Sequence, residues 1–190
     1  MTISNNVTPV DLYNITYKSY DKLYREEQYS KYEYIIRKGI IPRGLVLDIG
    51  CGTGLLVEFL INNKIDSFKQ YICLEPSHGM ISVLIKKTFT RDPRIIVIQG
   101  YAEQLPFPPQ SFDVIYMITV WDNLTQKSKV IEEVKRVIKR NGHIIISLLA
   151  RHGLEHSIRH FIKIVNEKGF TVIDKGDYRG EHFFQLVLKD

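Results

Sequence analysis

The stretch Leu45-Val46-Leu47-Asp48-Ile49-Gly50-Cys51-Gly52-Thr53-Gly54 decides the fold of this chain. An apolar run ends at an acid and opens into three glycines. That pattern is typical of a buried strand followed by a tight turn and the start of a helix. Because glycine has no side chain, Gly50, Gly52 and Gly54 permit positive φ and let a ligand approach the amino end of the helix. The stretch therefore predicts a cofactor-binding loop.

The glycine spacing separates two kinds of cofactor loop. A dinucleotide fingerprint needs G-x-G-x-x-G, and Leu55 occupies the place of its third glycine. The pattern D-x-G-x-G-x-G instead resembles the first motif of the class I S-adenosylmethionine-dependent methyltransferases. Its sequence is most similar to that of the methyltransferase type 11, UbiE-like group. The resemblance implies S-adenosyl-L-methionine as the cofactor and S-adenosyl-L-homocysteine as a product. A nicotinamide-dependent dehydrogenase is the disfavoured alternative.

The length and composition indicate one soluble domain. The chain has 190 residues, 44% of them hydrophobic and 25% charged, which suits a single globular core. No segment approaches the ~18 apolar residues of a membrane span, and the first residues lack the features of a secretory signal. We therefore expect a cytoplasmic protein. The two cysteines form neither a disulfide framework nor a zinc pattern.

Alternating strand and helix patterns predict the fold class. We expect an α/β, Rossmann-like sheet of seven strands, mostly parallel, with helices on both faces and an antiparallel last strand. Residues 1–43 are expected to form a helical segment that covers the site, and residues 44–190 the cofactor-binding domain. The predicted strands cover residues 45–49, 71–75, 94–99, 111–117, 143–149, 170–178 and 182–188, with a turn at Asn141-Gly142 before the fifth. Helices are predicted from Leu55 to about Asn62, from Ser77 to about Lys87 and from Gln126 to Lys139.

Two further motifs support the cofactor assignment. Glu75 ends the second strand about 20 residues after the last glycine, where this architecture places a carboxylate on the ribose hydroxyls. Residues 100–107, GYAEQLPF, resemble the family pattern G-D-A-E-x-L-P-F beside the adenine, with Tyr101 in place of the acid. The backbone contact at Ala102 is expected to remain, and Tyr101 either stacks on the adenine or covers it. The predicted cofactor-binding residues are Asp48, Gly50, Cys51, Gly52, Gly54, Glu75, Pro76, Tyr101, Ala102, Glu103 and Met117.

Residues after the fourth strand are expected to face the acceptor. In the family this resembles, substrate contacts follow that strand, here residues 118–123, so Thr119 and Trp121 are assigned to the substrate pocket. Asp122 is the nearest candidate base, with Tyr20 or Tyr24 behind it. These two tyrosines belong to a stripe, with Tyr13 and Tyr17, along one face of a predicted helix. The stripe either packs the helix onto the body or also caps the cofactor. A second helix is predicted from Glu27 to Lys38.

The acceptor stays open at this stage. The net charge of +5, and six Lys or Arg in residues 127–140, are compatible with an RNA substrate or with a solvated basic surface. The sequence of the G-x-A-E-x-L-P-F motif favours a small-molecule acceptor. A protein acceptor and a non-catalytic cofactor-binding subunit are also compatible with the sequence. Because no segment is inserted between the fifth and sixth strands, an activating protein partner is a further expectation. His152, His156 and His160 recur every four residues without an accompanying acid or cysteine, so we expect no metal.

Overall fold

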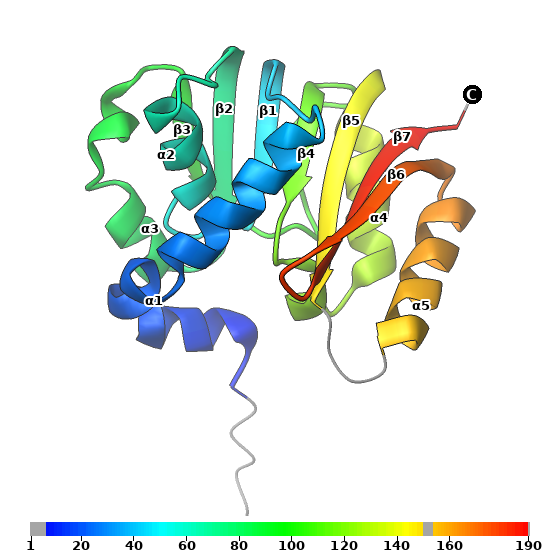
Figure 1. Cartoon of the computed structure of the whole chain (residues 1–190), viewed down its shortest axis with the longest axis horizontal. Helices are drawn as coiled ribbons and strands as arrows, with labels where there is room; N and C mark the ends of the chain where they lie inside the picture. The colour runs from blue at the N-terminus through cyan, green and yellow to red at the C-terminus, as the bar shows by residue number, and fades with distance from the viewer. Residues whose placement is uncertain (1–6, 150–153, 190) are drawn as a thin grey trace, which may run out of the picture.

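The computed structural model describes residues 7–149 and 154–189, and within them it shows a sheet flanked by helices (Figure 1). The strands follow the order β3-β2-β1-β4-β5-β7-β6, with β1, β2, β3, β4 and β5 parallel and β7 antiparallel to both of its neighbours. The predicted fold class is therefore confirmed. The elements are α1 (Pro9–Arg37), β1 (Gly44–Ile49), α2 (Leu55–Asn62), β2 (Phe68–Glu75), α3 (His78–Leu84), η1 (Thr88–Arg91), β3 (Ile95–Gln99), β4 (Phe112–Met117), η2 (Trp121–Asn123), α4 (Lys127–Val137), β5 (Ile138–Leu149), α5 (Leu154–Glu167), β6 (Phe170–Tyr178) and β7 (Glu181–Leu188).

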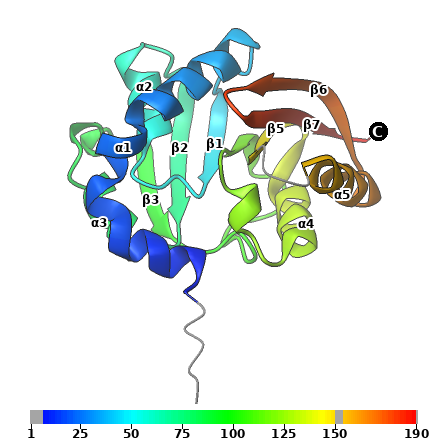
Figure 2. The ribbon, with the colours of Figure 1, turned by 60° about the horizontal axis from the view of Figure 1, so that its bottom comes forward.

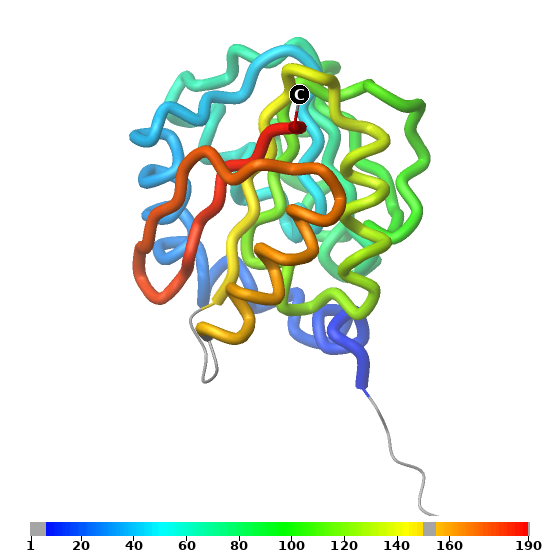
Figure 3. The backbone as a smooth tube through the Cα atoms, turned by 90° about the vertical axis from the view of Figure 1, so that its right-hand side faces the viewer, coloured from blue at the N-terminus to red at the C-terminus, as the bar shows by residue number. Residues whose placement is uncertain are grey.

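Two hydrophobic clusters lie on opposite faces of the sheet because successive strand residues point to opposite sides. Val46 belongs to the cluster under α1 and α2, whereas Leu47 belongs to the cluster under α4 and α5. Figure 3, which views the sheet along another direction, shows α1 and α4 on opposite sides of it. Both faces of the central strands are buried, which explains their continuous apolar runs.

The amino-terminal segment is one helix and not two. α1 runs unbroken from Pro9 to Arg37 and changes direction as it passes across the molecule (Figure 2). The predicted break before Glu27 is wrong, since Arg25, Glu26 and Glu27 are all good helix formers. Thr8 caps the helix through a capping box with Asp11. α1 packs on α2 and α3, and the predicted division of the chain at residue 43 stays a prediction.

The predicted turn at Asn141-Gly142 is also wrong. β5 begins directly after α4 and passes through both residues. Ile138 pairs with Phe112 and His143 pairs with Val114, so the ladder skips several residues of β5 at this point. Asn141 and Gly142 therefore lie in a bulge inside the strand, a conformation for which glycine is equally suited.

The helix that follows β2 is shorter than predicted. Ser77 caps α3 as expected, accepting a hydrogen bond from Met80 N at 3.1 Å, but α3 ends at Leu84 and η1 follows it.

No helix in the described ranges is long and apolar enough to cross a membrane.

Candidate functional site

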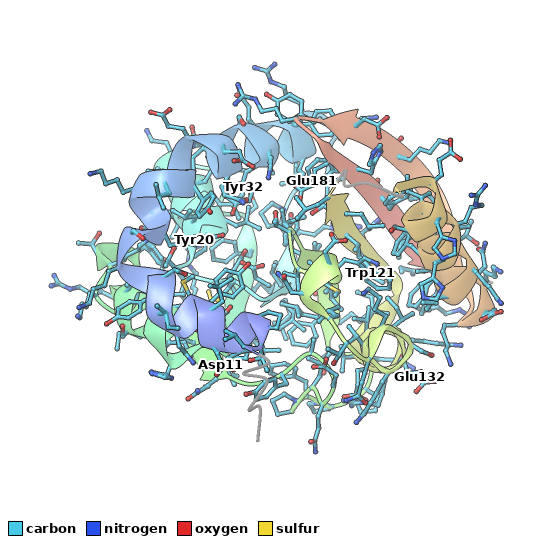
Figure 4. The ribbon with its side chains drawn as sticks, turned by 90° about the horizontal axis from the view of Figure 1, so that it is seen from below. Asp11, Tyr20, Tyr32, Trp121, Glu132 and Glu181 are labelled. Atoms are coloured by element: carbon cyan, nitrogen blue, oxygen red, sulfur yellow. The ribbon has the colours of Figure 1, made fainter. Side chains whose placement is uncertain are left out.

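A cavity with an empty volume of about 770 Å³ lies where the parallel strands end. Figure 4 views the molecule from this end, with Tyr20 of α1 on one side and Trp121 of η2 on the other. Such a place, outside the carboxyl ends of the strands, is where open α/β sheets bind ligands. The cavity is lined by Pro9, Val10, Tyr13, Tyr20, Ile49, Gly50, Gly52, Leu74, Glu75, Pro76, Met80, Gly100, Tyr101, Ala102, Glu103, Ile118, Thr119, Val120, Asn123 and Leu124.

The glycine loop forms the floor of this cavity. Gly50 and Gly52 both have positive φ, 70° and 59°. A Cβ on Gly50 would lie 2.6 Å from Val120 Cγ2, so a larger residue would push away the segment after β4. A Cβ on Gly52 would meet no atom within 4 Å and would project into open space. The loop therefore needs glycine once for packing and once for a backbone surface that a ligand can approach.

Glu75 is held against the glycine loop by two backbone donors. Gly52 N donates to Glu75 Oε2 and Ser77 N donates to Glu75 Oε1, each at 2.9 Å. The residue is 4% exposed, and burial raises its pKa although both hydrogen bonds oppose that shift. Each carboxylate oxygen keeps a second acceptor position, because a carboxylate has about four lone-pair sites. The geometry fits the ligation of two neighbouring hydroxyl groups.

Asp48 supplies a second buried carboxyl beneath the loop. Tyr71 Oη donates to Asp48 Oδ2 at 3.0 Å, and the residue is 3% exposed. Burial raises the pKa of Asp48 to about 7. Among the described residues no Lys, Arg or His forms an ion pair with it. A cationic ligand group nearby would favour the ionised form.

α1 closes one wall of the cavity and is fastened at two points. Asn14 Oδ1 accepts hydrogen bonds from Ser77 Oγ at 2.7 Å and from Gly79 N at 3.1 Å. On the other side Tyr13 Oη accepts from Asn123 Nδ2 at 3.2 Å. Tyr13 and Tyr20 both line the cavity, with their rings in an edge-to-face arrangement. Burial raises the pKa of Tyr20, so its phenol stays protonated at neutral pH and is suited to donate a hydrogen bond.

The segment after β4 forms the opposite wall. Ile118, Thr119 and Val120 all line the cavity. Thr119 has a φ of 60°, a left-handed conformation that is uncommon for a β-branched residue. Its backbone N donates to Ser147 Oγ at 2.7 Å, and its Oγ1 lies 3.5 Å from Gln28 Nε2. The strand order β3-β2-β1-β4 places this wall on the far side of the glycine loop from Glu75 and Tyr101.

Three other residues that were predicted to face the methyl acceptor do not line the cavity. Asp122 Oδ2 accepts from Leu149 N at 2.9 Å, which ties η2 to the end of β5 and turns the carboxylate away from the cavity lining. Trp121 is 2% exposed and packs edge-to-face on Phe161, so the tight turn of η2 sends it into the core. Tyr24 is 42% exposed and contacts the ring of Tyr20 from outside the cavity. None of these three residues lines the cavity, and their assignment to the acceptor site stays a prediction.

Four predicted cofactor residues lie behind the cavity surface. Asp48 and Met117 are buried, and Met117 points into the cluster under α4 and α5 because of strand alternation. Cys51 packs its side chain against the opposite cluster. Gly54 caps α2 with a φ of 76°, close to Leu84 and Phe89. Met117 thus packs in the core and Asp48 lies beneath the loop, whereas Cys51 and Gly54 belong to the loop itself. A cofactor-binding role for these four residues stays a prediction.

Several cavity residues carried no sequence signal. Pro9, Val10, Met80 and Leu124 line it as ordinary apolar side chains. Asn14 and Gln28 reach their partners across more than 60 residues of sequence. The spacing of the tyrosine stripe placed Tyr13 and Tyr20 on one helix face, and this was the one signal that pointed to α1.

Two of the three histidines of the tail lie in the part of the chain that the structure describes. His156 and His160 are exposed on α5, and His152 lies outside the described residues. Within residues 7–149 and 154–189 no group of three or more His, Cys, Asp or Glu is placed to hold a metal ion.

Comparison with known proteins identifies a family. The family model described as "Methyltransferase domain" matches residues 47–146. An uncharacterized protein of Methanocaldococcus jannaschii is 33% identical over 136 residues, covering 70% of this chain and 59% of that protein. The ubiquinone/menaquinone biosynthesis C-methyltransferase UbiE of Campylobacter jejuni is 27% identical over 104 residues, covering 53% of this chain and 43% of that enzyme. The chain thus spans about half the length of these curated relatives.

A solved structure matches the fold over nearly its whole length. It comes from the complex between the Haloferax volcanii Trm112 methyltransferase activator and a putative methyltransferase, with a TM-score of 0.79 and 15% identity. The match covers 96% of this chain and 99% of that one. At this identity the likeness concerns the fold alone.

Proposed function

This chain belongs to the methyltransferase-domain family, and from that premise we propose that it is an S-adenosylmethionine-dependent methyltransferase acting on a small molecule. The observation that carries the proposal is Glu75, fixed by Gly52 N and Ser77 N at the edge of the glycine loop. A dehydrogenase is disfavoured because Leu55 replaces the third glycine of the dinucleotide fingerprint.

The residues present fit S-adenosyl-L-methionine. Glu75 offers its free acceptor positions to the ribose hydroxyls, and the open space at Gly52 leaves room beside the loop. Asp48 is buried beneath the glycine loop and forms no ion pair with a protein cation among the described residues. The ammonium group of the methionine moiety, bound nearby, would stabilise the ionised form of Asp48. Gly100, Tyr101, Ala102 and Met80 line the part of the cavity assigned to the adenine.

The protein's own contribution to the reaction is orientation and exclusion of water. The bound cofactor supplies an activated methyl on its sulfonium sulfur, which passes to an acceptor atom while the S–C bonding electrons stay on sulfur. Tyr20 and Asn123 offer hydrogen bonds at the acceptor end, and Thr119 adds a hydroxyl. α1 covers this end and keeps solvent out, which strengthens polar contacts inside.

Enclosure and charge favour a small acceptor over RNA. The wall formed by Pro9, Val10, Tyr13 and Tyr20 covers the cavity that a polynucleotide would have to enter. Some of the basic side chains between residues 127 and 140 also form ion pairs and hydrogen bonds within the chain. Arg136 pairs with Glu133 and donates to two backbone carbonyls, and Lys139 pairs with Asp113.

A protein partner is a further proposal. The solved neighbour is a complex with a methyltransferase activator, and for that reason the test below uses complete cell extract, in which a partner would be present. Protein methylation becomes an outcome of the same test. The cytoplasmic location stays a prediction.

The test measures cofactor affinity and methyl transfer together. Calorimetry with S-adenosyl-L-methionine is expected to show one binding site, and Glu75→Ala to weaken binding by roughly 1.5 to 3 kcal/mol, the range for hydrogen bonds to a charged group. Methyl-labelled S-adenosyl-L-methionine is then incubated with extract and the wild-type protein. The label is expected in a fraction that organic solvent or ultrafiltration separates from macromolecules.

Matched controls separate the competing functions. Glu103 is a half-buried acid on the same cavity, and Glu103→Ala is expected to change affinity less than Glu75→Ala because it is Glu75 that accepts the hydrogen bond from Gly52 N. Labelling must fall in parallel with affinity in Glu75→Ala. Label lost on ribonuclease treatment would replace the small-molecule proposal by RNA, and label in protein would replace it by protein methylation. Binding of the cofactor without labelling would indicate a non-catalytic subunit, and tight binding of NAD would overturn the proposal.

A further inference from the structure

A chain of buried polar contacts starts at the strained residue of the cavity wall. Thr119 holds a φ of 60°, a left-handed conformation that is strained for a β-branched residue. Its backbone N donates to Ser147 Oγ at 2.7 Å. Ser147 is fully buried in β5 and in turn donates to Glu181 Oε1 at 2.8 Å. The hydrogen bond to Ser147 of β5 thus stabilises the strained conformation of Thr119.

The chain ends at a buried ion pair with α1. Lys31 Nζ lies 2.9 Å from Glu181 Oε2 and 2.6 Å from Glu27 Oε1. Lys31 and Glu181 are each 1% exposed, and Figure 4 shows Glu181, the first residue of β7, close to α1. Burial alone would lower the pKa of Lys31, but the contacts with Glu27 and Glu181 raise it, so its ammonium stays charged.

Stability alone does not account for this arrangement. Desolvating two charges offsets much of their attraction, and well-packed apolar residues often replace a buried ion pair without loss of stability. Here one oxygen of Glu181 faces Lys31 and the other accepts from Ser147, so the pair fixes the hydroxyl that holds Thr119. Gln28, on the same helix turn as Glu27 and Lys31, approaches Thr119 Oγ1 directly. α1 therefore reaches Thr119 by two routes.

The position of Thr119 matters for the cavity because of its neighbour Val120. Val120 covers Gly50, where even a Cβ would be too close. Thr119 O also lies 3.4 Å from Asn123 Nδ2, the group that meets Tyr13. A change at Thr119 would thus displace the wall between the glycine loop and the acceptor end.

We propose that Ser147 and Glu181, with Lys31, are positioning residues that hold Thr119 in its left-handed conformation and so shape the acceptor-side wall of the cavity. The inference rests on the proposed function for the identity of the ligand. It adds to that function three residues that touch neither cofactor nor acceptor and act through Thr119.

The experiment compares variants by two readouts. Ser147→Ala removes the acceptor of Thr119 N, and Glu181→Gln keeps an oxygen for Ser147 while removing the charge that faces Lys31. S-adenosyl-L-homocysteine affinity is measured by calorimetry, and the emission of Trp121, the single tryptophan, reports the segment two residues beyond Thr119 without any ligand. We expect about a tenfold loss of affinity in Ser147→Ala, a smaller loss in Glu181→Gln, and an altered emission in both.

Asp174→Asn is the matched control. It removes the Lys38–Asp174 pair at 3.1 Å, which joins α1 to the same hairpin at a half-exposed position. This variant is expected to bind within twofold of the wild type and to keep its emission. Thr119→Gly added to Ser147→Ala is expected to restore the emission and part of the affinity, since glycine adopts positive φ without cost.

The outcomes distinguish this inference from the proposed function. If the wild type binds no S-adenosyl-L-homocysteine, the proposed function fails, and the emission comparison still tests Thr119. If Ser147→Ala and Glu181→Gln keep both wild-type affinity and wild-type emission, the positioning role is overturned. A loss that the added Thr119→Gly does not relieve would also overturn it, because the effect would then arise from general destabilisation.

Discussion

Asp48 makes the stability of the folded chain depend on pH. Burial raises its pKa to about 7, against an ordinary value of 3.8. As pH rises, the Asp48 carboxyl therefore ionises first in the unfolded chain. Between the two pKa values the folded state keeps a proton on Asp48 that the unfolded state has lost. Its contribution to stability is fully present below the unfolded pKa and is lost as pH rises through about 7.

The variant Asp48→Asn removes this dependence while keeping a similar shape. From about pH 5 to about pH 8 the free energy of unfolding of the wild type is expected to fall by roughly 2–3 kcal/mol more than that of the variant. Denaturant titrations at the two pH values, without ligand, measure it. Tyr71→Phe is the control, since it removes the donor to Asp48 and should enlarge the pH effect. Parallel pH profiles of wild type and Asp48→Asn would contradict the role of burial.

Single residues were predictable from sequence where their partners are close in the chain or belong to a compact motif. Gly50, Gly52 and Glu75 lie within one strand-loop-helix unit and the following strand, and the spacing placed them correctly on the cavity. Thr119, Ser147 and Glu181 are joined across 28 and 34 residues, with no periodicity that relates them. Asp122 and Trp121 show the converse, because they lie close after β4 in the sequence but η2 directs both side chains away from the cavity.

Among the elements, α1 is the one that we expect to control ligand exchange, since four of its residues line the cavity. Its first half covers the cavity, and Asn14 fastens it to the amino end of α3 through Ser77 and Gly79. Gly79 is necessary there because a Cβ would lie 2.8 Å from the ring of Tyr17. We expect a bound ligand to leave only when this half of the helix moves, so its attachment should set the dissociation rate.

Asn14→Ala is expected to loosen the first half of α1 by about 1–2 kcal/mol, since two hydrogen bonds are lost. Hydrogen exchange of amides in residues 10–20 should become faster, and S-adenosyl-L-homocysteine should dissociate about tenfold faster in stopped-flow measurements. Ile15→Ala, at a neighbouring side chain that is 72% exposed, is the control and should leave both rates unchanged. Equal dissociation rates in Asn14→Ala and wild type would show that the ligand leaves by another route.

Element type was predictable where one local pattern acted alone. The strand β6 has the predicted bounds, and α4 was predicted to within two residues at each end, because each shows a clear period. The continuity of α1 and the bulge in β5 were missed, since pairing with distant elements decides them. Phe112 and Val114 set the path of Asn141-Gly142, and no local signal could reveal this.

At the scale of the whole molecule, the two hydrophobic clusters share one sheet. The cluster under α1 and α2 includes Val114 and Ile145, and the other cluster includes their strand neighbours Ile115 and Ile144. Loss of packing in one cluster therefore weakens the strands on which the other cluster packs. Residues 7–43 also lack a hydrophobic cluster of their own, because Tyr32 and Ile35 bury themselves against the body. The chain should therefore unfold as one cooperative unit.

The corresponding prediction is that α1 melts together with the sheet and that ligand binding shifts both. Far-ultraviolet circular dichroism, which follows the helices, and the emission of Trp121, which follows the cluster under α4 and α5, are expected to give the same Tm. S-adenosyl-L-homocysteine at 100 times its Kd should add about 2.7 kcal/mol and raise that Tm by about 5–11 °C. Adenosine lacks the methionine moiety and serves as the control, with a smaller shift expected. Two separate transitions, of which the ligand moves one, would instead identify the amino-terminal segment as a unit that folds independently of the sheet.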